Sequence, residues 1–170
     1  KVREERDDEA LAAFRMLAAE KKIWLLIGSL PIRLTSEKVA NRAFLISPEG
    51  AVAARYDKIH MFDVDLAGGE SYRESKNYEP GREASLTRLP WGRLGLTICY
   101  DIRFPEQFRD LARAGAQVIV VPTSWADGPE KLYQWRTLTA ARALDSTSWI
   151  AAAGQARQHQ MDDVVGEVVL

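Results

Sequence analysis

The sequence predicts a layered α/β fold, because short apolar runs alternate along the chain with segments of helical periodicity. Residues 1–22 carry apolar side chains at helical spacing and charged residues between them, which predicts an amphipathic helix. The apolar run Ile23 to Gly28 predicts a buried strand. The turn signature Pro48-Glu49-Gly50 separates two further apolar runs and predicts a β-hairpin, so we expect a mixed sheet.

The remaining elements follow from the same patterns. The expected hairpin strands are Ala43 to Ser47 and Ala51 to Tyr56, and residues 61–81 show no clean period and are expected to form a long loop. Pro90-Trp91-Gly92 turns the chain into a buried strand that ends at Cys99. Beyond it we expect a helix from Pro105 to Ala114, a strand from Gln117 to Val121, a helix from about Pro129 to Leu144 and a strand from Ser148 to Ala152.

Length and composition exclude several classes of protein. A chain of 170 residues suits one domain, and a net charge of −1 without a Lys/Arg block favours neither nucleic acid nor membrane partners. We find no apolar stretch near the ~20 residues of a membrane span. The single cysteine rules out an intrachain disulfide and is typical of a cytoplasmic protein. Two histidines, His60 and His159, and no CxxC pair argue against a metal site, and no glycine-rich phosphate motif indicates nucleotide binding.

Cys99 is the most informative residue of the chain. A lone cysteine is usually a small buried apolar side chain. This one ends an apolar strand, and residues at the carboxyl ends of strands lie at the mouth of an α/β sheet, where such proteins build their sites. The backbone N–H groups that follow can face a developing oxyanion.

Three segments around Cys99 resemble one family. They are residues 55–65 (RYDKIHMFDVD), residues 70–75 (ESYRES) and residues 94–106 (LGLTICYDIRFPE). Together they are similar to the nitrilase, or carbon–nitrogen hydrolase, superfamily, and within it to the ω-amidases and deaminated glutathione amidases. Residues 121–125 (VPTSW) and 141–145 (ARALD) continue the match. Lys58 precedes Cys99 by 41 positions (99 − 58) and Glu74 follows Lys58 by 16 (74 − 58), which is the family's order and spacing.

The resemblance implies a fold, a mechanism and an assembly. It implies an αββα four-layer sandwich of two mixed sheets between outer helices. It implies a Glu-Lys-Cys triad in which Cys99 is the nucleophile and Lys58 stabilises negative charge, while Glu74 orients the lysine and substrate. The backbone N–H of Tyr100 is then the expected oxyanion donor. The family needs neither metal nor organic cofactor, and a homodimer or larger homo-oligomer is expected.

The general-base glutamate of the triad is not found. The family places it on a strand that precedes the helix with which this chain begins. Glu4, Glu5 and Glu9 fall in the predicted helix and are interpreted as surface charges. The family is also longer where this chain has residues 160–166. We therefore expect a single carbon–nitrogen hydrolase domain over residues 1–170, partial at its N-terminus and near 160–166; an inactive, degenerate member is the alternative.

Two residues are weaker candidates for the substrate pocket. Trp125 follows a strand end that faces the same mouth, although core packing explains it equally well. Arg103 is either a substrate contact or part of an ion-pair network with Asp101 and Glu106 that holds the turn of the nucleophile.

Two further residue groups are given structural roles. His60 would share a strand face with Lys58 and is expected to make structural hydrogen bonds rather than act as a base. Arg142 and Asp145 lie three apart on a predicted helix and are expected to pair.

The sequence therefore predicts a cytoplasmic thiol amidase. It would hydrolyse a small linear amide, an ω-amide of a carboxylic acid, to carboxylate and ammonia through a cysteine thioester. A nitrilase or an N-carbamoyl amidohydrolase on the same triad is one alternative. A catalytically inactive nitrilase-like subunit that serves binding or assembly is the other.

Overall fold

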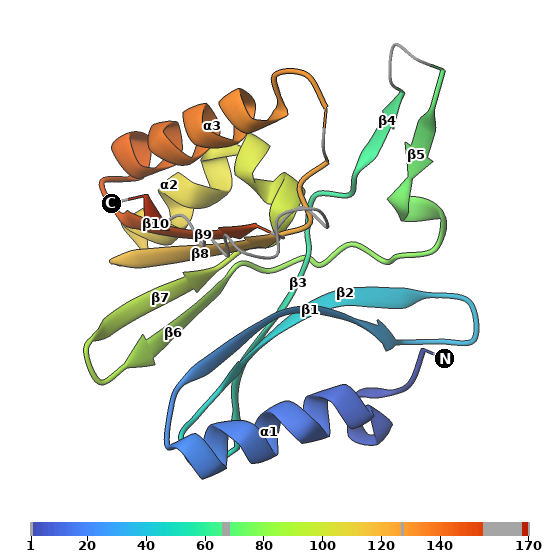
Figure 1. Ribbon diagram of the computed structural model, residues 1–170, viewed down its shortest axis with the longest axis vertical. Helices are drawn as coiled ribbons and strands as arrows, with labels where there is room; N and C mark the ends of the chain where they lie inside the picture. The colour runs from blue at the N-terminus through green and yellow to red at the C-terminus, as the bar shows by residue number, and fades with distance from the viewer. Residues whose placement is uncertain (1, 66–68, 127, 155–167, 170) are drawn as a thin grey trace. The chain divides into compact units, whose positions relative to one another are not determined.

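The computed structural model describes residues 2–65, 69–126, 128–154 and 168–169 (Figure 1). The chain divides into two compact units, of which the first ends at Glu83 and the second begins at Ala84. Each unit has its own sheet and its own buried core. We find no candidate for a membrane-spanning helix in the described part of the chain.

The first unit is an antiparallel sheet covered by one helix. Strands β1 (Leu25–Arg33), β2 (Val39–Ile46) and β3 (Val52–Asp57) pair in that order, and helix α1 (Glu9–Lys21) lies along one face (Figure 1). Leu11 and Ala18 of α1 are buried against apolar residues of β1 and β2, which are Ile27, Ile32, Ala40, Phe44 and Ile46. The β2–β3 hairpin confirms the expected turn at residues 48–50.

Gly50 in that hairpin turn lies directly against α1. Its φ is +76°, and a Cβ placed there would come within 2.7 Å of the Arg15 carbonyl oxygen. The Arg15 Nε in turn donates to the Gly50 carbonyl oxygen at 2.7 Å. Only glycine satisfies both the left-handed backbone and the close approach, so this turn helps to hold the helix on the sheet.

The predicted helix over residues 1–22 is wrong for its first eight residues. Asp8 has an extended backbone, and its side chain accepts a hydrogen bond from the Leu11 N–H at 2.8 Å, so it caps α1 and the helix begins at Glu9. Before the cap, Glu5–Asp7 form a 3₁₀ turn (η1), and Arg3 makes a β-bridge to Ile32. Phe14 and Leu17, which the helical pattern places on the apolar face, are 36% and 39% exposed.

Residues 61–81, expected to be a loop, contain a small hairpin. Strands β4 (Asp63–Asp65) and β5 (Ser71–Arg73) pair antiparallel, and a 3₁₀ turn, η2 (Glu74–Lys76), follows. Polar contacts hold the hairpin: Arg73 binds the Asp65 carboxylate at 2.6 and 2.8 Å. Because three-residue strands with exposed polar ends show no alternating apolar pattern, the sequence does not reveal them.

The second unit is a mixed sheet. Its order is β10 (Val168–Val169), β9 (Trp149–Gly154), β8 (Val118–Thr123), β7 (Gly92–Leu96) and β6 (Ser85–Leu89). Strands β7, β8 and β9 run parallel, while β6 and β10 pair antiparallel with their neighbours. The mixing therefore arises here rather than from the predicted hairpin, and β6 is a strand that the sequence analysis missed.

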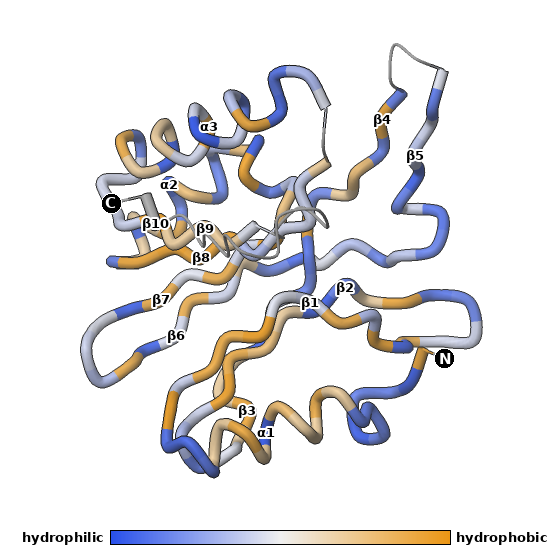
Figure 2. The backbone as a smooth tube through the Cα atoms, in the orientation of Figure 1, coloured by the Kyte–Doolittle hydropathy of each residue, from blue (hydrophilic) through white to orange (hydrophobic). Residues whose placement is uncertain are grey.

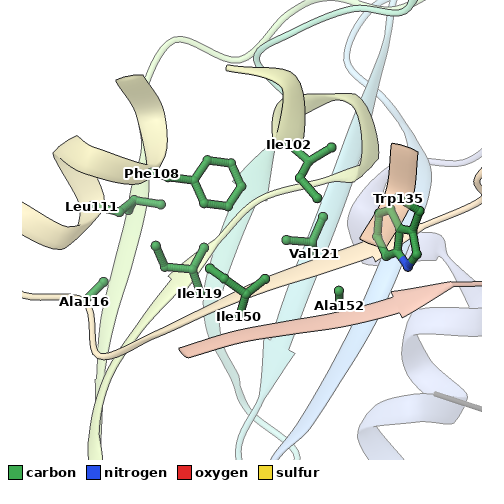
Figure 3. Close-up of a cluster of buried hydrophobic side chains, with 9 residues drawn as sticks. All are labelled: Ile102, Phe108, Leu111, Ala116, Ile119, Val121, Trp135, Ile150 and Ala152. Atoms are coloured by element: carbon green, nitrogen blue, oxygen red, sulfur yellow. The ribbon is translucent and has the colours of Figure 1, made fainter. Parts of the chain in front are cut away.

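Two helices cover one face of this sheet. Helix α2 (Pro105–Arg113) follows the turn that begins at Cys99, and α3 (Lys131–Ser146) connects β8 to β9 (Figure 1). The buried cluster between helices and strands is drawn in Figure 3 and comprises Ile102, Phe108, Leu111, Ala116, Ile119, Val121, Trp135, Ile150 and Ala152. Strand β8 is apolar along most of its length (Figure 2), as expected for a strand flanked by parallel neighbours. This packing holds the end of β7, after which the Cys99 turn begins.

Candidate active site

The structure brings Lys58 and Glu74 together within the first unit. Lys58 directly follows β3, and its side chain is only 3% exposed. Its ammonium group is bound to the Glu74 carboxylate, which is 14% exposed. A buried ammonium is stable only with such a partner, so Glu74 holds the Lys58 ammonium in this structure, and its role in catalysis stays a prediction.

The Glu74 carboxylate has two further donors. Its Oε2 also accepts the Phe62 backbone N–H at 2.7 Å, and its Oε1 accepts the Asn41 side-chain amide at 2.9 Å. Asn41 lies in β2, and its carbonyl oxygen accepts the Lys58 backbone N–H at 2.9 Å. Three polar groups thus fix one carboxylate in a single orientation. The sequence analysis missed Asn41, which lies beside Arg42 in a strand whose other residues are apolar.

Gly81 holds the backbone of Lys58 from the other side. Its N–H donates to the Lys58 carbonyl oxygen at 2.8 Å. A Cβ at this position would lie 2.1 Å from the Asp57 carbonyl oxygen, far closer than any real contact. The segment after η2 can therefore approach the end of β3 only because residue 81 is glycine.

A charged network anchors the residue before Lys58. Arg42 binds both oxygens of Asp57, at 2.6 and 2.8 Å, and also reaches Glu5 at 2.9 Å, while Arg55 binds Glu5 at 2.6 Å. The Arg55 hydrogen bond, with a contribution from Arg42, lowers the pKa of Glu5 below its ordinary value. Hydrogen bonding to Asp57 raises the pKa of Arg42. Glu5, which we interpreted as a surface charge, is partly exposed and is held by two arginines.

The hairpin that carries Glu74 is fastened next to it. Asp63 accepts the Ser75 backbone N–H at 3.0 Å and the Ser75 hydroxyl at 2.5 Å. The hydroxyl contact is the main cause of a lowered pKa of the Asp63 carboxyl. This contact holds the start of η2, where Glu74 lies, against β4.

Cys99 occupies a sharp turn in the second unit. It is the first residue of the 3₁₀ helix η3 (Cys99–Arg103) and has a left-handed backbone with φ of +48°, which is rare for a residue with a side chain. Thr97, two residues before Cys99, is hydrogen-bonded to β8, since its N–H and its hydroxyl both donate to the Val120 carbonyl oxygen. Such conformations recur at active sites, and they also occur at helix ends, where Lys22, Glu130 and Thr147 have a positive φ in this structure.

Buried polar groups hold this turn. Asp101 is fully buried, and its carboxylate accepts the Ile98 N–H at 2.8 Å. Arg142 of α3, also buried, donates from Nε to the Ile102 carbonyl oxygen at 2.7 Å and pairs with Asp145 at 2.5 Å. The expected Arg142–Asp145 pair is confirmed, and its arginine also supports the Cys99 turn.

Arg103 and Trp125 contact each other. The Arg103 guanidinium lies 5.5 Å from the Trp125 ring centroid and donates to Gln134 at 2.8 Å. The Trp125 indole packs at 5.1 Å from that of Trp135 and donates to the Lys131 carbonyl oxygen. Trp125 thus covers the buried cluster of the second unit, which supports its core-packing role. Glu106 pairs with Arg109, Arg103 donates to Gln134, and Asp101 accepts the Ile98 N–H.

Cys99 and Trp125 follow neighbouring strands at one edge of the sheet. Strands β7 and β8 are parallel, so their carboxyl ends meet at the same edge. Lys58 and Glu74 belong to the first unit and Cys99 to the second. The convergence of Cys99 on the Lys58–Glu74 pair and the oxyanion role of the Tyr100 N–H remain predictions. His60 lies beyond the end of β3, so the expected strand face shared with Lys58 does not exist, and His159 lies outside the described residues.

Comparison with known proteins identifies the family. A model of the carbon–nitrogen hydrolases matches residues 1–166, and the chain belongs to this family. A deaminated glutathione amidase of Yersinia enterocolitica is 38% identical over 148 residues, which are 85% of this chain and 51% of that protein. The chain spans about half the length of the curated relatives it matches.

Solved structures also resemble this chain. The C. elegans NitFhit protein matches 93% of this chain with a TM-score of 0.81 and 34% identity, over 39% of its own length. An amidase from Nesterenkonia sp. matches 88% of this chain and 53% of its own, with a TM-score of 0.74 and 29% identity. One mutant of that amidase, which belongs to the nitrilase superfamily, carries the acetamide moiety of fluoroacetamide on its active-site cysteine, and another binds butyramide. The expected superfamily and its mixed α/β fold class are confirmed.

Proposed function

We propose that this protein is a thiol amidase that hydrolyses a small linear ω-amide of a carboxylic acid. The observation that carries the proposal is the buried Lys58 ammonium, bound by a Glu74 carboxylate that two further donors hold. Its amidase relatives and the cysteine adduct of the Nesterenkonia enzyme support the choice of reaction.

The reaction uses Cys99 as the nucleophile. Its sulfur attacks the amide carbon and forms a C–S bond while the carbonyl π electrons move to oxygen. Lys58 and the Tyr100 N–H stabilise that oxyanion. The intermediate collapses as the C–N bond breaks, and the nitrogen leaves as ammonia after it takes up the proton that the Cys99 thiol gives up when the C–S bond forms. Water then attacks the thioester carbon, the C–S bond breaks and the sulfur takes up a proton from that water, so that amide and water give carboxylic acid and ammonia and the Cys99 thiol is restored.

Arg103 favours a substrate that carries a carboxylate. Its guanidinium is exposed, follows Cys99 by four positions, and is held by Gln134 and the Trp125 ring. A guanidinium fixed in this way binds carboxylates through paired hydrogen bonds. We place the distal carboxylate of the ω-amide at Arg103, beside the Trp125 ring that the guanidinium contacts.

Ammonia release tests the reaction. The 170-residue chain, and any longer natural form of the protein, are assayed with ω-amides of dicarboxylic acids and with neutral amides of the same length. Turnover that Cys99→Ala abolishes supports the proposal. Arg103→Leu should raise KM for the carboxylate-bearing amides alone, whereas the matched Arg109→Leu should change neither class. Release of ammonia only from nitriles or N-carbamoyl compounds would favour the related enzymes, and no turnover in any form would favour an inactive subunit.

We also propose a cellular location and an assembly for the protein. The lone thiol suits a reducing cytoplasm, and homo-oligomers are proposed on the resemblance to the family. Light scattering of the purified protein gives the oligomeric state directly.

A further inference from the structure

Asn41 connects Lys58, to which we assign charge stabilisation, with Glu74, to which we assign the orientation of that lysine. It lies in β2, whereas Lys58 follows β3 and Glu74 follows β5. Its carbonyl oxygen accepts the Lys58 N–H at 2.9 Å, and its side-chain amide donates to Glu74 Oε1, also at 2.9 Å. A single residue thus contacts the backbone of the lysine and the side chain of the glutamate.

The chemistry of the contact explains why an amide is needed there. Glu74 Oε2 receives the Lys58 ammonium and the Phe62 N–H, so rotation of the carboxylate is limited only if Oε1 is also held. Asn41 supplies that donor without a charge, and it therefore does not compete with Lys58 for the carboxylate. A carboxylate in this place would instead repel Glu74.

We propose that Asn41 is a positioning residue, which fixes the Glu74 carboxylate so that Glu74 holds the Lys58 ammonium where negative charge develops on the substrate. The inference rests on the proposed function for the roles of Lys58 and Glu74. Asn41 acts through these two residues, so its loss should lower kcat and leave KM nearly unchanged.

Two substitutions at Asn41 separate positioning from packing. Asn41→Asp keeps the volume of the side chain but replaces the donor with a like charge, whereas Asn41→Ala removes both volume and donor. Positioning predicts that kcat falls further in Asn41→Asp, by about tenfold to a hundredfold, than in Asn41→Ala. KM should stay within about twofold. Asn77→Asp makes the same chemical change at an exposed site of the same unit and should leave kcat unchanged.

Packing alone would give the opposite order, with Asn41→Asp close to the parent protein and Asn41→Ala impaired. That order, or a rise in KM with unchanged kcat, would overturn the inference.

Hydrogen exchange of the Phe62 amide provides a second measurement that needs no turnover. This N–H donates to the carboxylate that Asn41 holds. Its protection in the 170-residue chain should fall at least about tenfold in Asn41→Asp, while the Leu45 amide in the core of β2 keeps its protection. If the parent protein shows no amidase activity, the proposed function fails and this measurement alone decides. Unchanged Phe62 protection in both Asn41 variants would overturn the inference.

Discussion

The Lys58 ammonium is bound to the Glu74 carboxylate although 16 positions separate the two residues (74 − 58), and both side chains are largely buried. Desolvation makes each buried charge costly without the other. We therefore expect the two side chains to be coupled, both in the stability of the fold and in the position of their charges. This coupling can be measured by unfolding and by turnover.

Lys58→Met should lower the free energy of unfolding by about 3–5 kcal/mol, because it leaves a buried carboxylate without its cation. Adding Glu74→Gln removes that charge and should restore part of the loss, measured by urea denaturation of both single variants and the double variant. Turnover should fall at least about a hundredfold in Lys58→Met and should not return in the double variant. Losses of stability that add within about 0.5 kcal/mol would show that the two side chains are not coupled.

Gly81→Ala should destabilise the first unit, because the new Cβ would lie 2.1 Å from the Asp57 carbonyl oxygen. We expect a loss of about 2–3 kcal/mol in thermal or urea unfolding, and a lower kcat since the Lys58 backbone must move. Gly154→Ala is the control: its Cβ would meet Thr123 at 3.8 Å and should change stability by no more than about 0.5 kcal/mol. Equal effects at both glycines would argue against the close approach.

The left-handed backbone of Cys99 predicts an inverted order of stability for two substitutions. Cys99→Gly should unfold with a free energy about 1 kcal/mol higher than Cys99→Ala, because glycine adopts a φ of +48° without strain. At Ala140, on the exposed side of α3, a change to glycine should instead lower stability by about 1 kcal/mol. A Cys99→Gly protein less stable than Cys99→Ala would contradict the strained turn.

The ion pairs of Glu5 predict a dependence of stability on pH. Because its pKa is lowered in the folded protein, the stabilisation is present above the ordinary value of 4.5 and is lost as the pH falls through the folded pKa. Glu5→Gln should therefore cost about 1 kcal/mol at pH 7 and progressively less below pH 4.5. Glu4→Gln, at an exposed position, is the control and should show little difference at either pH. A constant deficit of Glu5→Gln at all pH values would exclude the linkage.

The sequence predicted the features that leave a repeating or familiar pattern. Residues 105–113, 118–123 and 149–154 form elements close to those expected, because their apolar residues face one buried core. The Lys58–Glu74 pair was predicted from the resemblance to a family and from its spacing, whereas no periodicity joins these two residues.

The missed features depend on contacts between distant segments. Asn41 looks like an ordinary polar residue of a strand unless its contact with Glu74 is known. Gly81 looks like an ordinary loop glycine unless its close approach to the end of β3 is known. The backbone of Cys99 was missed because a left-handed φ is usually signalled by glycine, and here a cysteine occupies the position. Tertiary contacts, not local preference, fix all three.

The covalent state of Cys99 during turnover tests the central claim most directly. The protein is mixed with an ω-amide, quenched in acid within the first turnovers, and analysed by intact-mass and peptide mass spectrometry. We predict an added mass equal to the substrate minus ammonia, located on Cys99 and lost in hydroxylamine, as a thioester requires. It should be absent in Cys99→Ala and strongly reduced in Lys58→Met. Ammonia release without an acyl group on Cys99, or with one on another residue, would contradict the account.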